Sequence, residues 1–460
     1  MEGERLQWLR LTRRCGCHQT ARSDRPVVSL WGRSRLPQRW PSALFGAAER
    51  RSVRRTKRRD NAAMGSYIFL SVGRFEVDWG KNNRFSDHSR LFLPGDERQT
   101  RYHYADDIRE TKPAFRRPLR SVRRRLELLG YSIKNCRSIY EDNMAYAGRY
   151  EDVSSISWDQ FVQGVRDIDV SQDGVVDNEG DYDLGEYAAH HLLERKPFGP
   201  LAPKDWHAKR ELGLILENLD PYVTLRLLAE NPRNLLRQVV WRHADLLDGG
   251  WIEPDELKPG LAPTDRYLVV TEGSSDAAVL RKSVALVVPD VADFFDFIDM
   301  SENYPFTGTG NLVRFCQGLV RIQIKNKVLV VFDNDTAGWD AFGKVKELTL
   351  PPTMYLAVLP DLPGLQCFRT EGPSGTSRED VNRRAASLEL YLDLRYGGPP
   401  KPKVRWTSYN DRLKRYQGEL IQKEAYVRGF LRGRRPHTYR MASLARVWEK
   451  LIAACIDTDV

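Results

Sequence analysis

The chain of 460 residues lacks the marks of several protein classes. It has no run of 18 uncharged apolar residues, so the sequence predicts no membrane span and no membrane partner. Its six cysteines form no paired CxxC spacing of a zinc site and are too few for a disulfide framework. A phosphate-binding GxxxxGK(S/T) loop is absent as well. We therefore expect a cytoplasmic protein with free thiols and no P-loop ATPase domain.

Excess charge is confined to a short leader. Residues 1–63 carry 15 Arg and one Lys against five acids, a net charge of +11, whereas the whole chain carries +10. The rest of the chain is thus close to neutral, and the basic pI is no evidence that it binds nucleic acid. The leader fits a basic arm or a transit peptide, but we favour an extension that does not fold, with the natural start at Met64.

Residues 64–260 predict an α+β domain. Short β-type runs surround a glycine turn, and apolar residues then recur at helical spacing. The expected strands are 67–72 and 75–77, and the expected helices are 119–130, 158–165 and 187–194, followed by helical segments over 212–244.

Residues 264–362 predict a Rossmann-like α/β core. Four runs rich in β-branched residues, at 266–271, 294–298, 327–332 and 354–359, alternate with helical patterns. This order predicts a parallel sheet covered by helices, with right-handed crossovers. The turn at Gly308 and Gly310 lacks the third glycine of a dinucleotide fingerprint, so we interpret it as a tight turn.

Acidic residues follow two of these strands. Glu272 and Asp276 come after the first strand, and Asp333 and Asp335 come directly after the third. Ligands bind beyond the carboxyl ends of parallel strands, so the four carboxylates are expected to converge there. Their mutual repulsion needs an offset, and one or two Mg²⁺ or Mn²⁺ ions provide one. Such ions can clamp a phosphodiester and generate a hydroxide nucleophile.

These motifs resemble a Toprim domain, the fold shared by bacterial primases, topoisomerases and OLD-type nucleases. Glu272-Gly273 after one strand and Asp333-x-Asp335 after a later one carry the resemblance, and Asp276 is most similar to the nuclease branch. The resemblance implies two sets of metal ligands, Glu272 with Asp276 and Asp333 with Asp335. It also implies catalytic roles for Glu272, Asp333 and Asp335, with Glu272 as general acid or base.

The segment that begins at Met64 (MGSYIFLSVGRFEVDWGKNN) is similar to bacterial N-terminal domains found in front of HEPN or Toprim domains. Together the two resemblances imply a bacterial HEPN/Toprim-associated protein that acts on DNA or RNA. The ATPase half of OLD nucleases and the transesterifying tyrosine domain of topoisomerases are missing, which favours a nuclease. A partner protein or a homo-oligomer would fit this organisation, and the family analogy suggests defence against foreign nucleic acid.

Residues 363–460 predict a basic, helical C-terminal region. A helix is expected from Glu379 through Leu394, which brings Asp380 and Glu389 toward the metal edge as accessory ligands. Cations then alternate with aromatic residues, a composition that suits a nucleic-acid backbone with stacked bases. The candidate nucleic-acid contacts are Arg405, Trp406, Arg412 and Arg415.

Two alternatives to a metal-dependent nuclease stay open. The Toprim-like sheet could serve as a regulatory module that binds metal, nucleotide or nucleic acid without turnover. Alternatively, Arg237 and His243, expected one to two helical turns apart, could form the metal-independent RNA-cleaving pair of HEPN-type nucleases.

Overall fold

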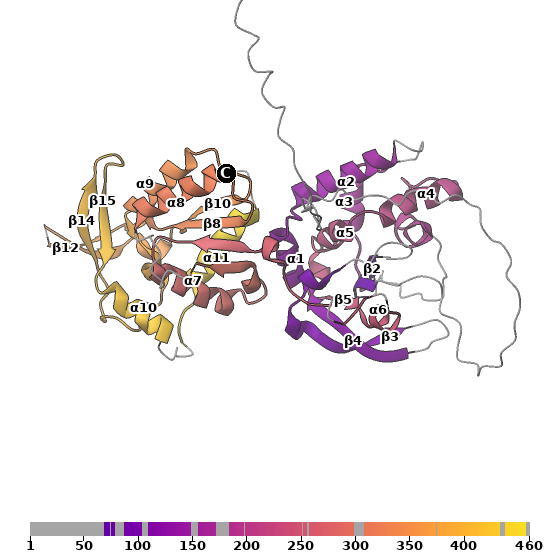
Figure 1. Ribbon diagram of the computed structural model, residues 1–460, viewed down its shortest axis with the longest axis horizontal. Helices are drawn as coiled ribbons and strands as arrows, with labels where there is room; N and C mark the ends of the chain where they lie inside the picture. The colour runs from indigo at the N-terminus through magenta and orange to yellow at the C-terminus, as the bar shows by residue number, and fades with distance from the viewer. Residues whose placement is uncertain are drawn as a thin grey trace, which may run out of the picture. The chain divides into compact units, whose positions relative to one another are not determined.

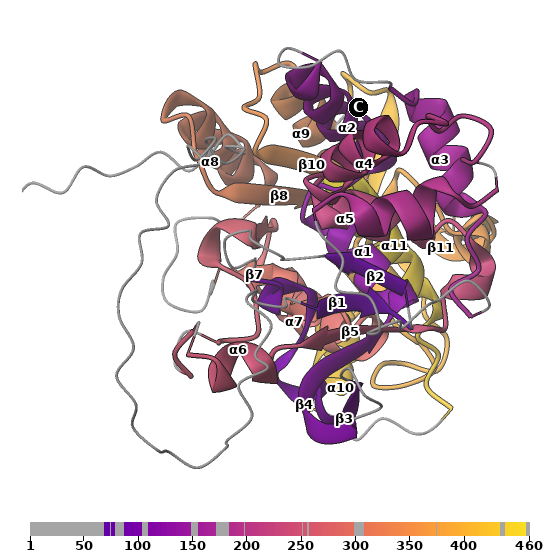
Figure 2. The same cartoon turned by 90° about the vertical axis from the view of Figure 1, so that its right-hand side faces the viewer.

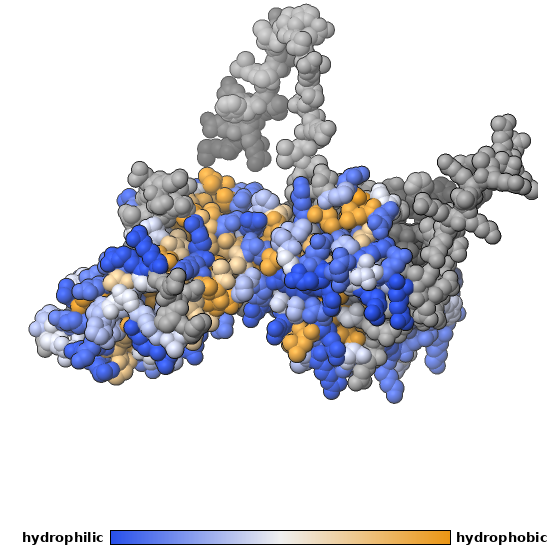
Figure 3. All heavy atoms as spheres, turned by 90° about the horizontal axis from the view of Figure 1, so that it is seen from below, coloured by the Kyte–Doolittle hydropathy of each residue, from blue (hydrophilic) through white to orange (hydrophobic). Residues whose placement is uncertain are grey.

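The computed structural model describes residues 69–460 except 74, 79–86, 104–108, 149–154, 172–183, 197, 251, 255–256, 299–307, 374, 433–437 and 457–460. The expectations for residues 1–63 and for Cys15 and Cys17 lie outside this range. The four cysteines that are described, Cys136, Cys316, Cys367 and Cys455, are free thiols as expected. No helix in the described ranges is long and apolar enough to cross a membrane. The face seen in Figure 3 is mainly hydrophilic, with smaller apolar patches between.

The N-terminal part contains a five-stranded antiparallel sheet in the order β2-β1-β5-β4-β3. Its strands are β1 (Phe69–Val72), β2 (Phe75–Asp78), β3 (Glu97–His103), β4 (Arg109–Pro118) and β5 (Gln238–Arg242). The first two strands confirm the sequence prediction. The helical prediction for 212–244 is wrong at β5, where the β-branched and aromatic run Val239-Val240-Trp241 is buried at the centre of the sheet.

Helices share a hydrophobic core with this sheet. They are α1 (Leu119–Leu128), α2 (Ile133–Ala147), α3 (Trp158–Arg166), α4 (Trp206–Glu217), α5 (Pro221–Leu228) and α6 (Ala244–Asp248), with a π-helical turn, η3 (Ala188–Leu193). The expected helices at 119–130 and 158–165 are confirmed as α1 and α3. In α1, Leu119, Val122 and Leu126 are fully buried on one stripe, as their spacing predicts.

A four-stranded parallel sheet, in the order β10-β8-β6-β7, carries the acidic motifs. Its strands are β6 (Tyr267–Val270), β7 (Phe295–Phe297), β8 (Lys327–Phe332) and β10 (Met354–Val358), close to the predicted ranges. The connecting helices are α7 (Ser274–Val287), α8 (Thr309–Arg321) and α9 (Thr336–Lys346). The predicted mixed α/β organisation with a parallel sheet is thereby confirmed (Figures 1 and 2).

Both faces of this sheet are covered, which explains its nearly continuous apolar strands. Along β8, Leu329 and Val331 pack with α7 and the C-terminal helix α11 (Ala442–Ile456). Val328, Val330 and Phe332 point to the other face and pack with α8 and α9. The alternation follows from the two-residue period of a strand.

The prediction of a helical C-terminal region is wrong for most of its first half. No α-helix spans 379–394, where the chain forms the end of β12 (Gly375–Glu379), the two-residue strand β13 (Ala385–Ala386) and the 3-10 turn η8 (Leu388–Tyr391). A four-stranded sheet in the order β12-β11-β14-β15 occupies this region. Its strands are β11 (Phe368–Gly372), β12 (Gly375–Glu379), β14 (Val404–Asn410) and β15 (Arg415–Leu420). The helices that do form are α10 (Lys423–Arg432) and α11.

Candidate metal-binding acidic site

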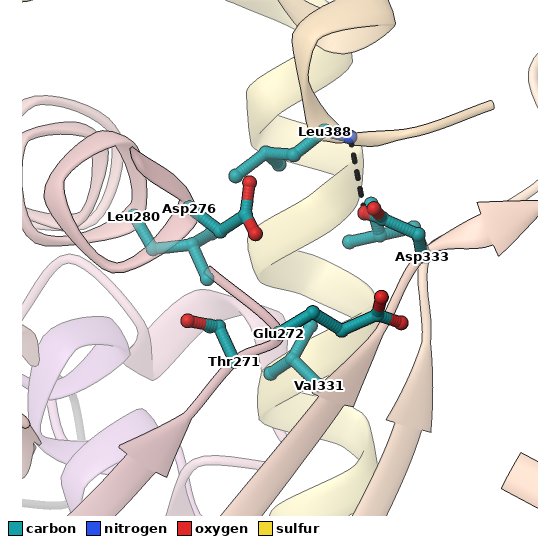
Figure 4. Close-up of a pocket in the computed structure, with 8 residues that line it drawn as sticks. Thr271, Glu272, Asp276, Leu280, Val331, Asp333 and Leu388 are labelled. Atoms are coloured by element: carbon teal, nitrogen blue, oxygen red, sulfur yellow. Dashed lines mark hydrogen bonds between the residues drawn. The ribbon is translucent and has the colours of Figure 1, made fainter. Parts of the chain in front are cut away.

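Three carboxylates from separate segments surround one small pocket at the carboxyl ends of β6 and β8. Glu272 lies two residues beyond the end of β6, Asp276 lies in the first turn of α7, and Asp333 directly follows β8. All three line the pocket, together with Thr271, Leu280, Val331, Leu359 and Leu388. Figure 4 shows their carboxylates around a common space. The sequence-based expectation of convergence is met for these three residues.

Asp333 is held in place by the segment that follows β13 (Ala385–Ala386). The backbone N–H of Leu388 donates a hydrogen bond of 3.1 Å to Oδ1 of Asp333 (Figure 4). Gly273, the residue before α7, packs close to Asp276, since a Cβ at this position would lie 3.2 Å from Asp276 Oδ2. A backbone hydrogen bond thus orients Asp333, and Asp276 lies close to the backbone at Gly273.

Asp335 is buried and caps α9. Its Oδ1 accepts a 2.7 Å hydrogen bond from Gly338 N, as expected of an N-cap residue. Its Oδ2 accepts a 2.6 Å hydrogen bond from Nε2 of Gln417, a residue of β15. Asp335 therefore combines a capping role with a direct link to the C-terminal sheet.

The turn that carries Asp333 and Asp335 requires a glycine at position 338. A Cβ there would lie 2.2 Å from the Asp333 carbonyl oxygen, too close for any side chain. The first turn of α9 therefore packs directly on the backbone of the acidic motif. The Asp333-x-Asp335 turn is therefore kept compact both by this close packing and by the capping hydrogen bond of Asp335.

Burial and mutual repulsion raise the pKa of these carboxyl groups. Burial, Asp335 and Asp276 raise the pKa of Glu272 to about 8. Burial and Glu389 raise the pKa of Asp276 to about 7. The pKa values of Asp333 and Asp335 are also raised, mainly by burial. The cluster thus disfavours full ionisation, and a bound cation would reverse that preference.

A fifth carboxylate, Glu389, and a lysine, Lys423, also contribute to the charge at the acidic site. Glu389 in η8 is 4% exposed, and its Oε1 lies 3.9 Å from Nζ of Lys423 at the start of α10. Burial alone would lower the pKa of Lys423, yet Glu389, Asp276 and Asp333 hold it above its ordinary value. Lys423 is therefore the cation that partly balances the acidic cluster.

Two buried carboxylate oxygens suggest that the site can take a cation. Oε1 of Glu272 and Oε2 of Glu389 are inaccessible and have no hydrogen-bond partner. Buried oxygens without partners are costly, and oxygen ligands are what Mg²⁺ and Mn²⁺ prefer. Among the described residues, however, no three His, Cys, Asp or Glu side chains stand close enough to form a preassembled metal-ligand set. The donor types of the pocket still fit a hard cation.

The remaining predicted accessory and nucleic-acid residues lie on the C-terminal sheet and its turns. Asp380 is exposed and accepts hydrogen bonds from Asn382, so it forms a turn. Arg405 and Arg415 are exposed on β14 and β15. Trp406 lies under the guanidinium of Arg384, and Arg412 pairs with Asp340 at 3.4 Å.

The comparison with known protein families bears on the N-terminal part. Residues 64–265 match the family model described as HEPN/Toprim N-terminal domain 1. This HEPN/Toprim N-terminal match supports the resemblance carried by the segment after Met64. It ends at residue 265, so the Toprim resemblance of 264–362 stays a prediction. No curated protein and no solved structure matches the chain.

The alternative Arg237–His243 pair lies inside this HEPN/Toprim N-terminal match, but the structure does not bring the two residues together. They flank strand β5 instead of lying on one helix, so their Cα atoms are about 20 Å apart. His243 is 1% exposed, and its Nε2 lies 3.2 Å from Oε1 of Glu97. Burial lowers the pKa of His243, although Glu97 opposes this effect.

Sequence reasoning missed three residues near the acidic residues, Lys423 and Gln417 through their side chains and Arg384 through its backbone. Lys423, Gln417 and Arg384 reach the acidic edge from the C-terminal part of the chain. No local spacing links them to Asp333 or Asp335. The available signal was that the C-terminal region is rich in cations and amides. That region was expected to be helical, whereas part of it forms strands.

Proposed function

We propose that the chain is a Mg²⁺- or Mn²⁺-dependent nuclease, or a related phosphoryl-transfer enzyme, with a Toprim-type acidic site. The observation that carries the proposal is the convergence of Glu272, Asp276 and Asp333 on one pocket beyond the ends of two parallel strands. The unpartnered, buried Oε1 of Glu272 supports it further. Glu272, Asp276, Asp333 and Asp335 would hold one or two ions. When bound, such an ion would activate water and stabilise charge on a phosphodiester.

The chain's own residues have distinct roles in this proposal. Glu272 lines the pocket beside Asp276 and Asp333, and we propose it as general acid or base. Asp333 and Asp335 are oriented by Leu388 and Gln417, so their carboxylates are fixed before substrate arrives. The proposed substrate is nucleic acid, and the proposed setting is the bacterial cytoplasm. A role in defence rests on family analogy alone.

The test is cleavage of DNA and RNA by the full chain with Mg²⁺, Mn²⁺ or EDTA. Glu272→Ala and Asp333→Asn are expected to lower metal-dependent cleavage by about 10²-fold or more. Asp296→Asn is the matched control, because this carboxylate of the same parallel sheet is exposed and pairs with Arg266 at 3.4 Å. The proposal is wrong if Asp296→Asn loses as much metal-dependent cleavage as Glu272→Ala, or if Glu272→Ala keeps full activity. Cleavage that persists in EDTA would instead favour Arg237 and His243.

A second candidate is a regulatory module that binds metal, nucleotide or nucleic acid without turnover. It would use the same pocket, lined by Glu272, Asp276 and Asp333, to hold its ligand. In that case Mn²⁺ would raise the melting temperature of the wild type but not of Asp333→Asn, and no cleavage would occur with any substrate. The same two proteins and the same ion thus separate the candidates.

A further inference from the structure

The hairpin formed by β14 and β15 carries a local excess of positive charge. Residues 401–420 contain six Lys or Arg and two acids, whereas the chain beyond residue 63 is close to neutral. Arg405 and Arg415, one on each strand, are exposed. The hairpin is therefore a candidate contact for a polyanion.

Two exposed tyrosines face each other across this hairpin. Tyr409 and Tyr416 are directly opposite in the strand register, and their ring centroids are 4.9 Å apart at an interplanar angle of 67°. They are 47% and 51% exposed. Large aromatic rings usually bury their faces, so two adjacent rings left open to solvent offer a surface on which flat molecules can stack.

The aromatic row continues from the tyrosines to the acidic site. The ring centroids of Trp406 and Tyr416 are 6.4 Å apart, and the Arg384 guanidinium carbon lies 4.1 Å from the ring centroid of Trp406. Arg384 forms a β-bridge with Asp335, and its carbonyl accepts a 3.1 Å hydrogen bond from Gly418 N. One unbroken set of contacts thus leads from the exposed tyrosines to a candidate metal ligand.

Hairpin stability alone accounts for only part of this arrangement. Cross-strand aromatic contacts do stabilise hairpins. That role does not require a row that ends at Asp335. Gln417, the neighbour of Tyr416, also donates a hydrogen bond to Asp335. The strand that carries Tyr416 is therefore connected directly to the acidic site.

We propose that the β14–β15 hairpin binds single-stranded nucleic acid, with unpaired bases stacked on Tyr409 and Tyr416. The bases of a duplex are already stacked on one another, so they cannot use the rings, whereas a single strand exposes its base faces. The row through Trp406 to Arg384 would lead the strand toward Asp335. This inference rests on the proposed function, because it names the substrate class of the same acidic site.

The experiment measures binding by fluorescence anisotropy in EDTA, with the full chain carrying Glu272→Gln so that no substrate is cut. The probes are a labelled single-stranded DNA, an RNA of the same sequence, and the corresponding DNA duplex. Replacing both tyrosines, Tyr409→Ala with Tyr416→Ala, is expected to weaken single-strand binding about tenfold or more. Duplex binding and the salt dependence should stay unchanged, because no charge is removed.

Two controls make the result specific. Tyr409→Phe with Tyr416→Phe keeps both rings and should retain single-strand affinity, even if the alanine variant proves unstable. Trp206→Ala removes an exposed aromatic ring of α4 and should change nothing. The basic residues 1–63 are present in every variant, so their contribution cancels in the comparison.

Three results would overturn the inference: duplex binding as tight as single-strand binding, an unchanged affinity in the alanine variant, or an equal loss for both probes. Comparing the affinities for the single-stranded DNA and for the RNA of the same sequence shows which of the two the hairpin prefers. Tyrosine-dependent binding without metal-dependent cleavage would reject only the proposed nuclease. Metal-dependent cleavage with binding that does not depend on the tyrosines would reject only the inference that bases stack on Tyr409 and Tyr416.

Discussion

At the scale of single residues, Gly338 is the position where the fold leaves least room near the acidic site. Gly338→Ala would place a methyl group 2.2 Å from the Asp333 carbonyl oxygen, so α9 or the acidic turn must shift. We expect a loss of stability of about 1–3 kcal/mol and at least a tenfold loss of metal-dependent cleavage. Thermal melting and cleavage rates measure both.

Gly343 provides the control within the same helix. A Cβ at Gly343 meets only Nη2 of Arg412, at 3.6 Å, which is an ordinary contact. Gly343→Ala should therefore stabilise α9 by up to about 1 kcal/mol and leave cleavage intact. If the two alanine variants behave alike, the packing argument for Gly338 is wrong.

The acidic residues themselves could be predicted from the sequence, because their positions depend only on where strands end. Glu272 and Asp333 follow apolar runs, and the carboxyl ends of parallel strands share an edge. Lys423 and Gln417 could not be predicted, since each reaches the site from a segment roughly 80 or more residues further along the chain. Only the tertiary fold decides which distant side chains approach a buried charge.

At the scale of elements, helix α11 closes one face of the parallel sheet. Trp448 is fully buried, its ring centroid lies 5.0 Å from that of Phe295, and its Nε1 donates a 2.8 Å hydrogen bond to Oγ of Ser283 in α7. Trp448→Ala should lower the free energy of unfolding by about 3–5 kcal/mol, because a large cavity remains and the buried Ser283 hydroxyl loses one of its two hydrogen bonds. Urea denaturation followed by circular dichroism measures the loss.

Trp206→Ala is the matched control for this prediction. Trp206 is 41% exposed at the start of α4, so its removal should change the unfolding free energy by less than about 1 kcal/mol. A comparable loss in both variants would mean that α11 does not contribute as its burial indicates.

Element prediction succeeded where the residue pattern had one interpretation. The run Lys327-Val-Leu-Val-Val-Phe332 is β8 with the predicted bounds, since β-branched residues on both faces exclude an amphipathic helix. The helix expected over 379–394 failed because its apolar residues, Leu388, Tyr391 and Leu392, are buried by a short 3-10 turn. At that length, burial alone does not distinguish the two conformations.

At the scale of the whole molecule, stability should depend on pH through Glu76, a partly buried acid of the N-terminal sheet. Burial raises the pKa of Glu76 in β2 to about 7, although Arg242 opposes the effect. Between its unfolded pKa near 4.5 and about 7, the folded state binds more protons, so stability falls as pH rises through this window. Glu76→Gln removes this dependence.

The measurement is urea denaturation of wild type and Glu76→Gln at pH 5 and pH 8. At pH 8 the variant should be more stable than the wild type by at most about 3 kcal/mol, and the difference should shrink at pH 5. Contributions from the acidic site are present in both proteins and cancel. Parallel pH profiles would show that Glu76 does not titrate differently in the folded state.

The position of α11 in the chain also affects how the protein is made. Strands β6, β7, β8 and β10 are all synthesised well before Ala442, yet the face formed by Val269, Leu329 and Ala357 is covered with the help of α11. While the ribosome is still translating residues 360–440, this apolar face is open to solvent or to chaperones. Docking of α11 therefore completes the core of the parallel sheet only after nearly the whole chain has been made.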